Sequence, residues 1–274
     1  MKQGRFIHKL ALASGILLAT ASQQASAISI NLDFLGGLST SQQTIFTQAE
    51  QFWESVLIGY KPGIDPSIET TGISISAEGT PIDGVGGILG SAGPLTGWNS
   101  GGYILTATGA MTFDSADLAN LENNGSLGDV ILHEMAHVLG LGTLWELNGL
   151  YTQNSGEYTG AFGLAAYQDE FNQPGATFIP VELGGGPGTA NGHWDEVDGG
   201  AGLTGITDSN GNDMRNELMT GWLNAPAFVS NTTKMSFQDL GYEVAAVPVP
   251  AAAWLFISGL GLLFGFSARK KTTH

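Results

Sequence analysis

Five consecutive residues, His133-Glu134-Met135-Ala136-His137, constrain the fold more than any other feature of the sequence. Two imidazoles four residues apart lie on the same face of a helix, about one turn from each other. That spacing suits two ligands of one tetrahedral zinc ion, with the glutamate beside the coordination position that the protein leaves open. The chain must therefore build a helix here and bring a further ligand to it from elsewhere.

The residues around this motif favour a helix. Ser126 and Asp129 have the spacing of a capping box, and Gly140 stands where a helix would end. Apolar side chains recur between them at helical spacing, at Val130, Ile131, Met135, Val138 and Leu139. We therefore predict a helix over residues 127–139, with both histidines on one face.

The small number of histidines narrows the choice of a third ligand. A catalytic zinc site uses three protein ligands and one water, and the sequence has five His and no Cys. His8 and His274 lie in the terminal segments, so His193, in a polar loop flanked by glycine, is the favoured third ligand. An acidic ligand is the alternative, and the candidates are Glu157, Glu196 and Glu217.

The amino-terminal segment is typical of a secretory signal peptide. Lys2, Arg5 and Lys9 precede an apolar stretch, and Ala25-Ser26-Ala27 supplies the small residues that a signal peptidase cleaves after. We expect residues 1–27 to be removed, so that the mature protein begins at Ile28 and is exported.

The carboxyl-terminal segment, residues 247–271, combines three features. Val247-Pro248-Val249-Pro250 comes first, an apolar run follows, and Arg269-Lys270-Lys271 closes the segment. Extended through Ser267, the apolar run is just long enough to cross a membrane, and the basic cluster would stay cytoplasmic. A simple membrane anchor is one interpretation of this order.

The same order resembles the PEP-CTERM sorting signal of bacterial exported proteins, although Val249 stands where Glu is usual. The resemblance implies that a processing enzyme of the exosortase type cuts near the proline motif. The protein would then be anchored in the membrane transiently and be released or transferred to the cell envelope or the extracellular matrix.

Charge is distributed unevenly along the chain. Nine Lys and Arg face 25 Asp and Glu in the whole sequence, yet six of the basic residues and no acidic residue lie in residues 1–27 and 247–274. Residues 28–246 therefore carry three basic and 25 acidic residues, a net charge of −22. Such a domain repels phosphate backbones, which excludes nucleic acid as a partner.

Several segments of the domain predict strands. Alternation from Ile28 to Phe34 predicts a strand at its start, and Ile73 and Ile75 mark a second. Residues 103–113, rich in Thr and apolar side chains, predict one or two more. Residues 84–102 carry eight glycines, which indicates an irregular loop.

Helical spacing recurs in three further segments. Thr40 and Gln43 have the spacing of a capping box, and apolar residues then follow a helical period until Gly59. Residues 161–171 show a weaker helical pattern, and a short last helix is expected over residues 233–240. The intervening sequence is rich in Gly and Asn, which favours loops.

The run from His133 to Gly140 resembles the zinc helix of metzincin proteases, in which the glycine turns the chain toward the third histidine. Most metzincins place that histidine three residues after the glycine, where this chain has Thr143. The leishmanolysin family carries a long insertion there, and His193 follows Gly140 by 53 positions. Glu217-Leu218-Met219-Thr220 resembles the family's Met-turn.

The resemblance implies a zinc endopeptidase domain over residues 28–246. Its fold would be α+β, with a small mixed sheet, two main helices and a loop-rich carboxyl-terminal half. One zinc ion, held by His133, His137 and His193, would have Met219 beneath it. Eukaryotic members are rich in disulfides and use a pro-segment, whereas latency through a cysteine ligand is impossible in this Cys-free chain.

Glu134 would act as the general base of peptide-bond hydrolysis, on a water whose pKa bound zinc lowers. An extended protein or peptide substrate is expected to pair with an edge strand of the sheet, for which residues 109–113 are the candidate.

A non-catalytic surface or matrix protein with a structural metal site is the competing interpretation. A closed zinc site needs a fourth protein ligand, which in this chain would have to be a carboxylate.

A calcium site is one interpretation of the segment around Gly211, because hard oxygen ligands cluster there, at Asp208, Asn210, Asn212 and Asp213. No Glu stands at the closing position of a calcium loop, so a polar turn is the other interpretation of this segment.

Overall fold

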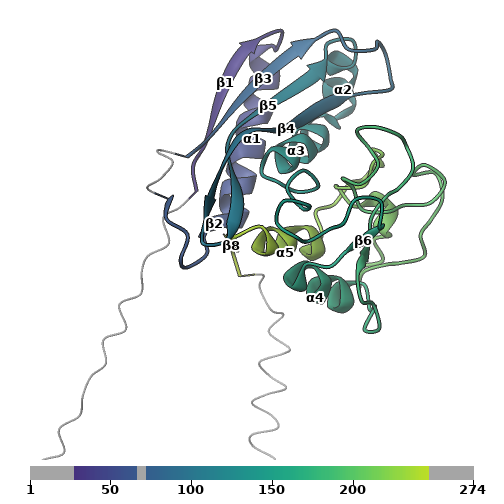
Figure 1. Ribbon diagram of the computed structural model, residues 1–274. Coiled ribbons are helices and arrows are strands. Elements are labelled where there is room, and N and C mark those ends of the chain that lie inside the picture. The colour runs from purple at the N-terminus through teal and green to yellow at the C-terminus, as the bar shows by residue number, and fades with distance from the viewer. Residues whose placement is uncertain (1–27, 67–71, 247–274) are drawn as a thin grey trace, which may run out of the picture.

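The computed structural model describes residues 28–66 and 72–246 (Figure 1). The signal peptide predicted over residues 1–27 and the sorting segment predicted over residues 247–271 lie outside this described part. Within the described residues, none of the helices has the length and apolar character needed to cross a bilayer.

A four-stranded mixed sheet forms one layer of the domain. Its strands lie in the order β1 (Ile30–Gly36), β3 (Ile73–Thr80), β5 (Tyr103–Asp114) and β4 (Gly90–Ser100). The first three run parallel, and β4 pairs antiparallel with β5. The α+β class and the small mixed sheet expected from the sequence are confirmed.

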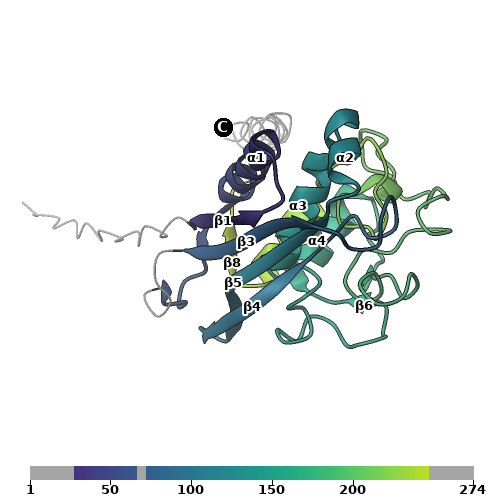
Figure 2. The same cartoon turned by 90° about the horizontal axis from the view of Figure 1, so that it is seen from above.

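The two longest helices, α1 (Thr40–Val56) and α3 (Leu127–Val138), lie side by side on one face of this sheet (Figure 2). Three shorter helices complete the α-helices of the described residues: α2 (Leu118–Asn124), α4 (Ala161–Glu170) and α5 (Asn231–Asp239). The α1 and α3 helices were predicted from apolar periodicity, and α2, only two turns long, was not.

Loops dominate the chain after α3, as expected. Its other regular elements are the two-residue strands β6 (Glu157–Tyr158) and β7 (Ile179–Pro180), the 3₁₀ helix η2 (Met214–Asn216) and β8 (Tyr242–Val244). The last of these pairs with β2 (Leu57–Tyr60), which follows directly after α1, so the end of the domain returns to its beginning. Figure 1 shows α4, α5 and the long loops below and beside the sheet.

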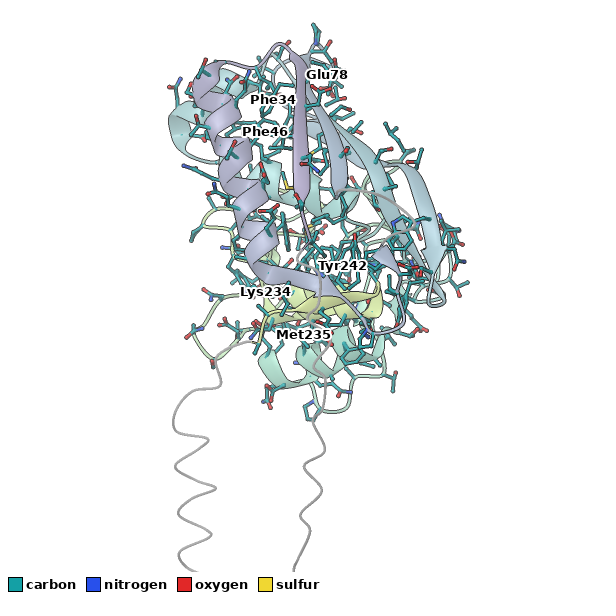
Figure 3. The ribbon with its side chains drawn as sticks, turned by 90° about the vertical axis from the view of Figure 1, so that its left-hand side faces the viewer. Phe34, Phe46, Glu78, Lys234, Met235 and Tyr242 are labelled. Carbon is teal, nitrogen blue, oxygen red and sulfur yellow. The ribbon has the colours of Figure 1, made fainter. Side chains whose placement is uncertain are left out.

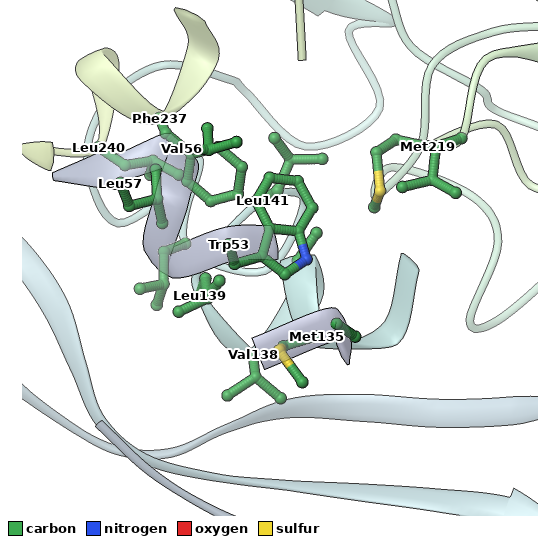
Figure 4. Packing of buried hydrophobic residues seen from close by; sticks show 14 of the residues in the cluster. Trp53, Val56, Leu57, Met135, Val138, Leu139, Leu141, Met219, Phe237 and Leu240 are labelled. Carbon is green, nitrogen blue, oxygen red and sulfur yellow. The ribbon is translucent and has the colours of Figure 1, made fainter. Parts of the chain in front are cut away.

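Aromatic side chains of α1 join the sheet, α3 and α5 in one core. The ring of Phe46 contacts Phe34 of β1 and Phe113 of β5 edge to face, and Figure 3 shows it beside Phe34. Trp53 is fully buried, packs on Phe237 of α5 (Figure 4), and its indole N–H donates to the backbone oxygen of Leu132 at 3.1 Å. The ring contact thus joins α1 to α5, and the indole hydrogen bond joins α1 to α3.

The prediction of an irregular loop over the glycine-rich residues 84–102 is wrong for residues 90–100, which form β4. Glycine and Pro94 remove the apolar alternation that marks a strand in sequence. The strand forms because its backbone pairs with β5, with irregular register on both sides of Thr96. Since β4 covers β5, residues 109–113 are interior and cannot be the exposed edge, so that prediction is also wrong.

Both predicted capping boxes differ from the structure. The box that begins α1 uses Ser39 and Gln42, one position earlier than predicted. Ser126 makes no side-chain cap on α3, because the chain reaches it directly from the left-handed Gly125 that ends α2, and its hydroxyl donates to Asn124 instead. A capping residue needs an extended backbone, which Ser126 does not have.

Candidate metal centre

The structure brings three histidines together. His133 and His137 come from the last two turns of α3, and His193 comes from the loop region between β7 and η2. Their Nε2 atoms form a triangle in which every separation is 3.0 Å. Among the described residues, no other His, Asp or Glu joins this group.

The other ring nitrogen of each histidine faces a backbone carbonyl. The Nδ1 to oxygen distances are 2.7–2.8 Å, to Leu218 from His133, to Leu141 from His137 and to Thr189 from His193. Because a carbonyl oxygen only accepts, each Nδ1 must carry the proton. Each neutral ring then presents a lone pair at Nε2.

Three lone pairs at this spacing cannot hydrogen-bond to one another, and without a cation they repel. Protonation does not supply the cation easily, since burial lowers the pKa of His193 to about 3 and also lowers the pKa values of His133 and His137. Two nitrogen ligands of a tetrahedral ion at 2.0–2.1 Å lie ~3.3 Å apart. The three histidines therefore lie close enough to bind a metal ion, and their donor set fits one.

Gly140 directs the chain back to the site. Its φ of +112° is rare for residues other than glycine. Gly140 follows α3 at the place predicted for the end of the helix. The turn brings the carbonyl of Leu141 to the Nδ1 of His137. Gly142, also at positive φ, packs directly on the backbone of Gly192, so a side chain there would separate the turn after α3 from the His193 segment.

His193 is held in a short ladder of three chain segments. The amide of Glu182 donates to the carbonyl of His193 at 3.0 Å, and the amide of Trp194 donates to Met219 at 2.9 Å. The Trp194 ring is fully buried, stacks on Trp145 at 4.8 Å, and donates its indole N–H to Thr233. This anchoring orients the adjacent histidine toward α3.

The turn around Met219 supports His133. Met219 is fully buried, and the preceding Leu218 provides the carbonyl that accepts from the His133 ring. The Glu217 carboxylate accepts hydrogen bonds from Met219 N, from both the amide and the hydroxyl of Ser230, and from the Thr233 hydroxyl. The carboxylate is thus engaged at the start of α5 and does not join the histidines.

The other acidic alternatives are also placed away from the three histidines. Glu157 is exposed on β6. Glu196 is buried, and its carboxyl group lies beside that of Glu182. Neither joins the histidine group, so the third position of the cluster is taken by His193.

Glu134 lies on α3 between the two histidines and is only 7% exposed. Burial raises the pKa of its carboxyl group to about 8, and a cation bound nearby would lower it again. The edge strand covers this group, because a methyl group placed on Gly90 would lie 3.0 Å from the Glu134 Cγ. Sequence reasoning missed Gly90, since the close approach of strand and helix is a tertiary feature.

The proposed calcium ligands form a self-contained turn. The two carboxylate oxygens of Asp208 accept from the backbone and side-chain amides of Asn210 and Asn212. Asp213 accepts from Thr204, Gly205 and Arg215. These hydrogen bonds are the ones expected of a polar turn, the other interpretation of this segment.

Comparison with known proteins adds no relationship to this geometry: no family model matches the chain, and no curated protein matches it at a significant level.

Proposed function

We propose that this protein is an exported zinc endopeptidase with a metzincin-like fold, similar to the leishmanolysin family. The observation that carries the proposal is the convergence of three imidazole lone pairs, two of them on buried rings, next to a buried glutamate, with no fourth protein ligand among the described residues. Three nitrogen donors with one open position are typical of catalytic zinc sites, and structural sites are closed by a fourth ligand.

His133, His137 and His193 would hold the ion, and nitrogen donors at tetrahedral spacing favour zinc. When bound, zinc would supply a Lewis acid and lower the pKa of a coordinated water to about 7. The carbonyls of Leu218, Leu141 and Thr189 keep the three rings neutral and oriented.

Glu134 would take the proton from the attacking water and pass it to the amine nitrogen that leaves as the peptide bond breaks. Its helix position directs the carboxylate to the same side of α3 as the two histidines. The backbone of β4 at Gly90 lies close to this side chain, which is only 7% exposed, so it would restrict the movement of the carboxylate and the access of bulk water.

The candidate for substrate pairing is now β4 instead of residues 109–113. Among the described strands β4 pairs with β5 alone, so its other edge is free to bind an extended peptide. Gly90 on this strand contacts Glu134, so a peptide added at this edge would run beside the proposed base.

The predicted terminal segments supply the cellular context of the proposal. A signal peptide over residues 1–27 would export the enzyme, and residues 247–271 would hold it at the membrane until an exosortase-type enzyme acts. The substrate would then be an extracellular or envelope protein or peptide.

A protease assay tests the proposal. Purified mature protein should cleave a casein-type substrate, a zinc chelator should abolish the cleavage, and added zinc should restore it. Stoichiometric zinc without cleavage of casein or of a diverse peptide library would instead favour the non-catalytic surface protein with a structural metal.

A further inference from the structure

The Glu217 carboxylate contacts two of the segments that hold the histidine cluster, although it does not join the cluster itself. The side chain is only 2% exposed. Its Oε2 atom accepts from the Met219 amide at 2.6 Å. Its Oε1 atom accepts from the Ser230 amide at 3.0 Å, the Ser230 hydroxyl at 2.8 Å and the Thr233 hydroxyl at 2.7 Å. All four partners are donors, which suits an ionised carboxylate.

The contact at Oε2 leads to His133 through a single peptide unit. The amide nitrogen of Met219 and the carbonyl oxygen of Leu218 belong to the same planar peptide and point in opposite directions. The carboxylate binds the amide side, and the His133 ring donates its Nδ1 proton to the carbonyl side at 2.7 Å. Because the peptide is planar, holding its amide also fixes the direction of its carbonyl. Hydrogen bonds in such a chain polarise one another, so the carboxylate makes this carbonyl a better acceptor for the ring.

The contacts at Oε1 lead to the segment of His193. The Thr233 hydroxyl gives its one proton to Glu217, and its lone pairs accept the indole N–H of Trp194 at 2.8 Å. Trp194 directly follows His193, is fully buried, and also donates its backbone amide to the Met219 carbonyl at 2.9 Å. An unbroken chain of hydrogen bonds therefore joins the neighbour of His193 to the same carboxylate.

The two histidines reached in this way come from distant parts of the chain. His133 lies on α3, and His193 lies in a loop 60 positions later, yet their Nε2 atoms are 3.0 Å apart. Helix α5 provides a common support, since Ser230 is its N-cap residue and Thr233 lies in its first turn. The positive end of the helix dipole also lowers the cost of burying the Glu217 charge there.

We propose that Glu217 is a positioning residue of the metal centre, which holds His133 and His193 in the arrangement that binds the ion. It acts on the first through the peptide between Leu218 and Met219, and on the second through the Thr233 hydroxyl. The proposal rests on the histidine cluster of the proposed function and does not require peptidase activity. Loss of a hydrogen-bonding partner of a metal-ligating histidine typically lowers metal affinity by about 10- to 100-fold, which sets the size of the expected effect.

Glu217→Gln tests the path to His133. The amide keeps one oxygen for the three donors at Oε1, but its NH₂ group would then face the Met219 N–H, so that contact is lost. The Kd for zinc, measured by competition with a chelator in conditions where the variant is folded, should rise about tenfold or more.

Glu170→Gln is the matched control. Glu170 is a carboxylate at the same end of α5, where it accepts from the amides of Asn231 and Thr232 and from the Thr232 hydroxyl. Among the described residues these are its hydrogen-bond donors, and none of them belongs to a histidine segment. The variant should therefore lose stability, as Glu217→Gln does, while its Kd for zinc stays within about twofold of the unaltered value.

Proton NMR of the zinc-loaded protein with isotope-labelled histidine separates positioning from general destabilisation. The Nδ1 proton of His133 should move upfield in Glu217→Gln, because its hydrogen bond to Leu218 becomes weaker. The Nδ1 proton of His137, which binds the Leu141 carbonyl, should keep its chemical shift and serves as the internal reference.

Two variants of Thr233 test the path to His193. Valine has nearly the same shape but leaves the indole N–H of Trp194 without its acceptor, so the Kd for zinc should rise about tenfold in Thr233→Val. Thr233→Ser retains the hydroxyl and should bind zinc within about threefold of the unaltered protein. This pair decides the question alone if Glu217→Gln does not fold.

The positioning role would be overturned if Glu217→Gln matched Glu170→Gln in zinc affinity and in the His133 proton shift, or if both Thr233 variants bound zinc like the unaltered protein. Tight zinc binding without peptidase activity would refute the proposed function and leave the positioning role in place. Failure of the unaltered protein to bind zinc would refute both.

Discussion

Gly90→Ala is a sensitive test of how the edge strand positions Glu134. Gly90 is the first residue of β4 and pairs with Phe113 of β5. Its backbone is not in the left-handed region, so alanine can adopt the same conformation. The added methyl group would lie 3.0 Å from Cγ of Glu134 and 3.2 Å from both Cδ and Oε1, closer than the ordinary contact range that begins at 3.4 Å.

The glutamate therefore has to move by a few tenths of an ångström. A displacement of 1 Å in a reacting group costs up to about 10²-fold in rate, so a shift of roughly half that size should lower kcat/KM by about tenfold. The imidazoles are not contacted, and zinc affinity should stay within about twofold. The free energy of unfolding should change by less than ~1 kcal/mol. Alanine lowers the conformational entropy of the unfolded chain, and this stabilisation offsets part of the cost of the close contact with Glu134.

The assay compares kcat/KM, zinc affinity and melting temperature of the two proteins. Gly128→Ala is the matched control, since it lies on the same helix as Glu134 and its methyl group would meet only Ile45, at 3.6 Å. It should retain the unaltered rate. A Gly90→Ala rate within twofold of the unaltered protein, or an equal loss in Gly128→Ala, would refute the proposed positioning of Glu134 by β4.

Three further predictions follow from the site and the sequence. Glu134→Gln should keep zinc while the hydrolysis rate falls by about 10² or more, and loss of zinc together with activity would show a structural role instead. His193→Ala and His137→Ala should weaken zinc binding equally, by about 10² to 10³ if each ligand contributes a quarter of the 10–16 kcal/mol of a four-ligand site. Near-normal zinc affinity of His193→Ala, measured by competition with a chromogenic chelator, would remove it from the site. Intact mass of the released protein should show that residues after about 250 are missing, and a species that retains Lys271 would contradict this.

The helices that carry the site could be predicted because the residues that specify each helix are close together in the sequence. Apolar periodicity defined α1 and α3, and the i, i+4 spacing placed His133 and His137 on one face. His193 was favoured because it is the one histidine outside the motif and the terminal segments. Its neighbouring residues do not indicate how it comes close to α3. It reaches α3 through the ladder with Glu182 and Met219, residues that are distant in sequence from the helix.

The elements that were missed depend on tertiary contacts. Strand β4 carries glycines and Pro94 where alternation would be expected, and only its pairing with β5 makes it a strand. The contact between Gly90 and Glu134, and the approach of Gly142 to Gly192, leave no periodic signal, since each glycine is required by a neighbour from another part of the chain.

The stacked indoles of Trp145 and Trp194 make the His193 segment optically observable. Their rings are 4.8 Å apart and inclined by 27°, both are fully buried, and Trp194 is the immediate neighbour of His193. Indoles this close couple their electronic transitions, so they should give a paired near-ultraviolet circular dichroism band that depends on the docked arrangement. Cobalt bound at the three imidazoles would in addition quench Trp194 emission by energy transfer. The His193 segment therefore contains its own spectroscopic probe, and its docking can be followed in real time without any attached dye.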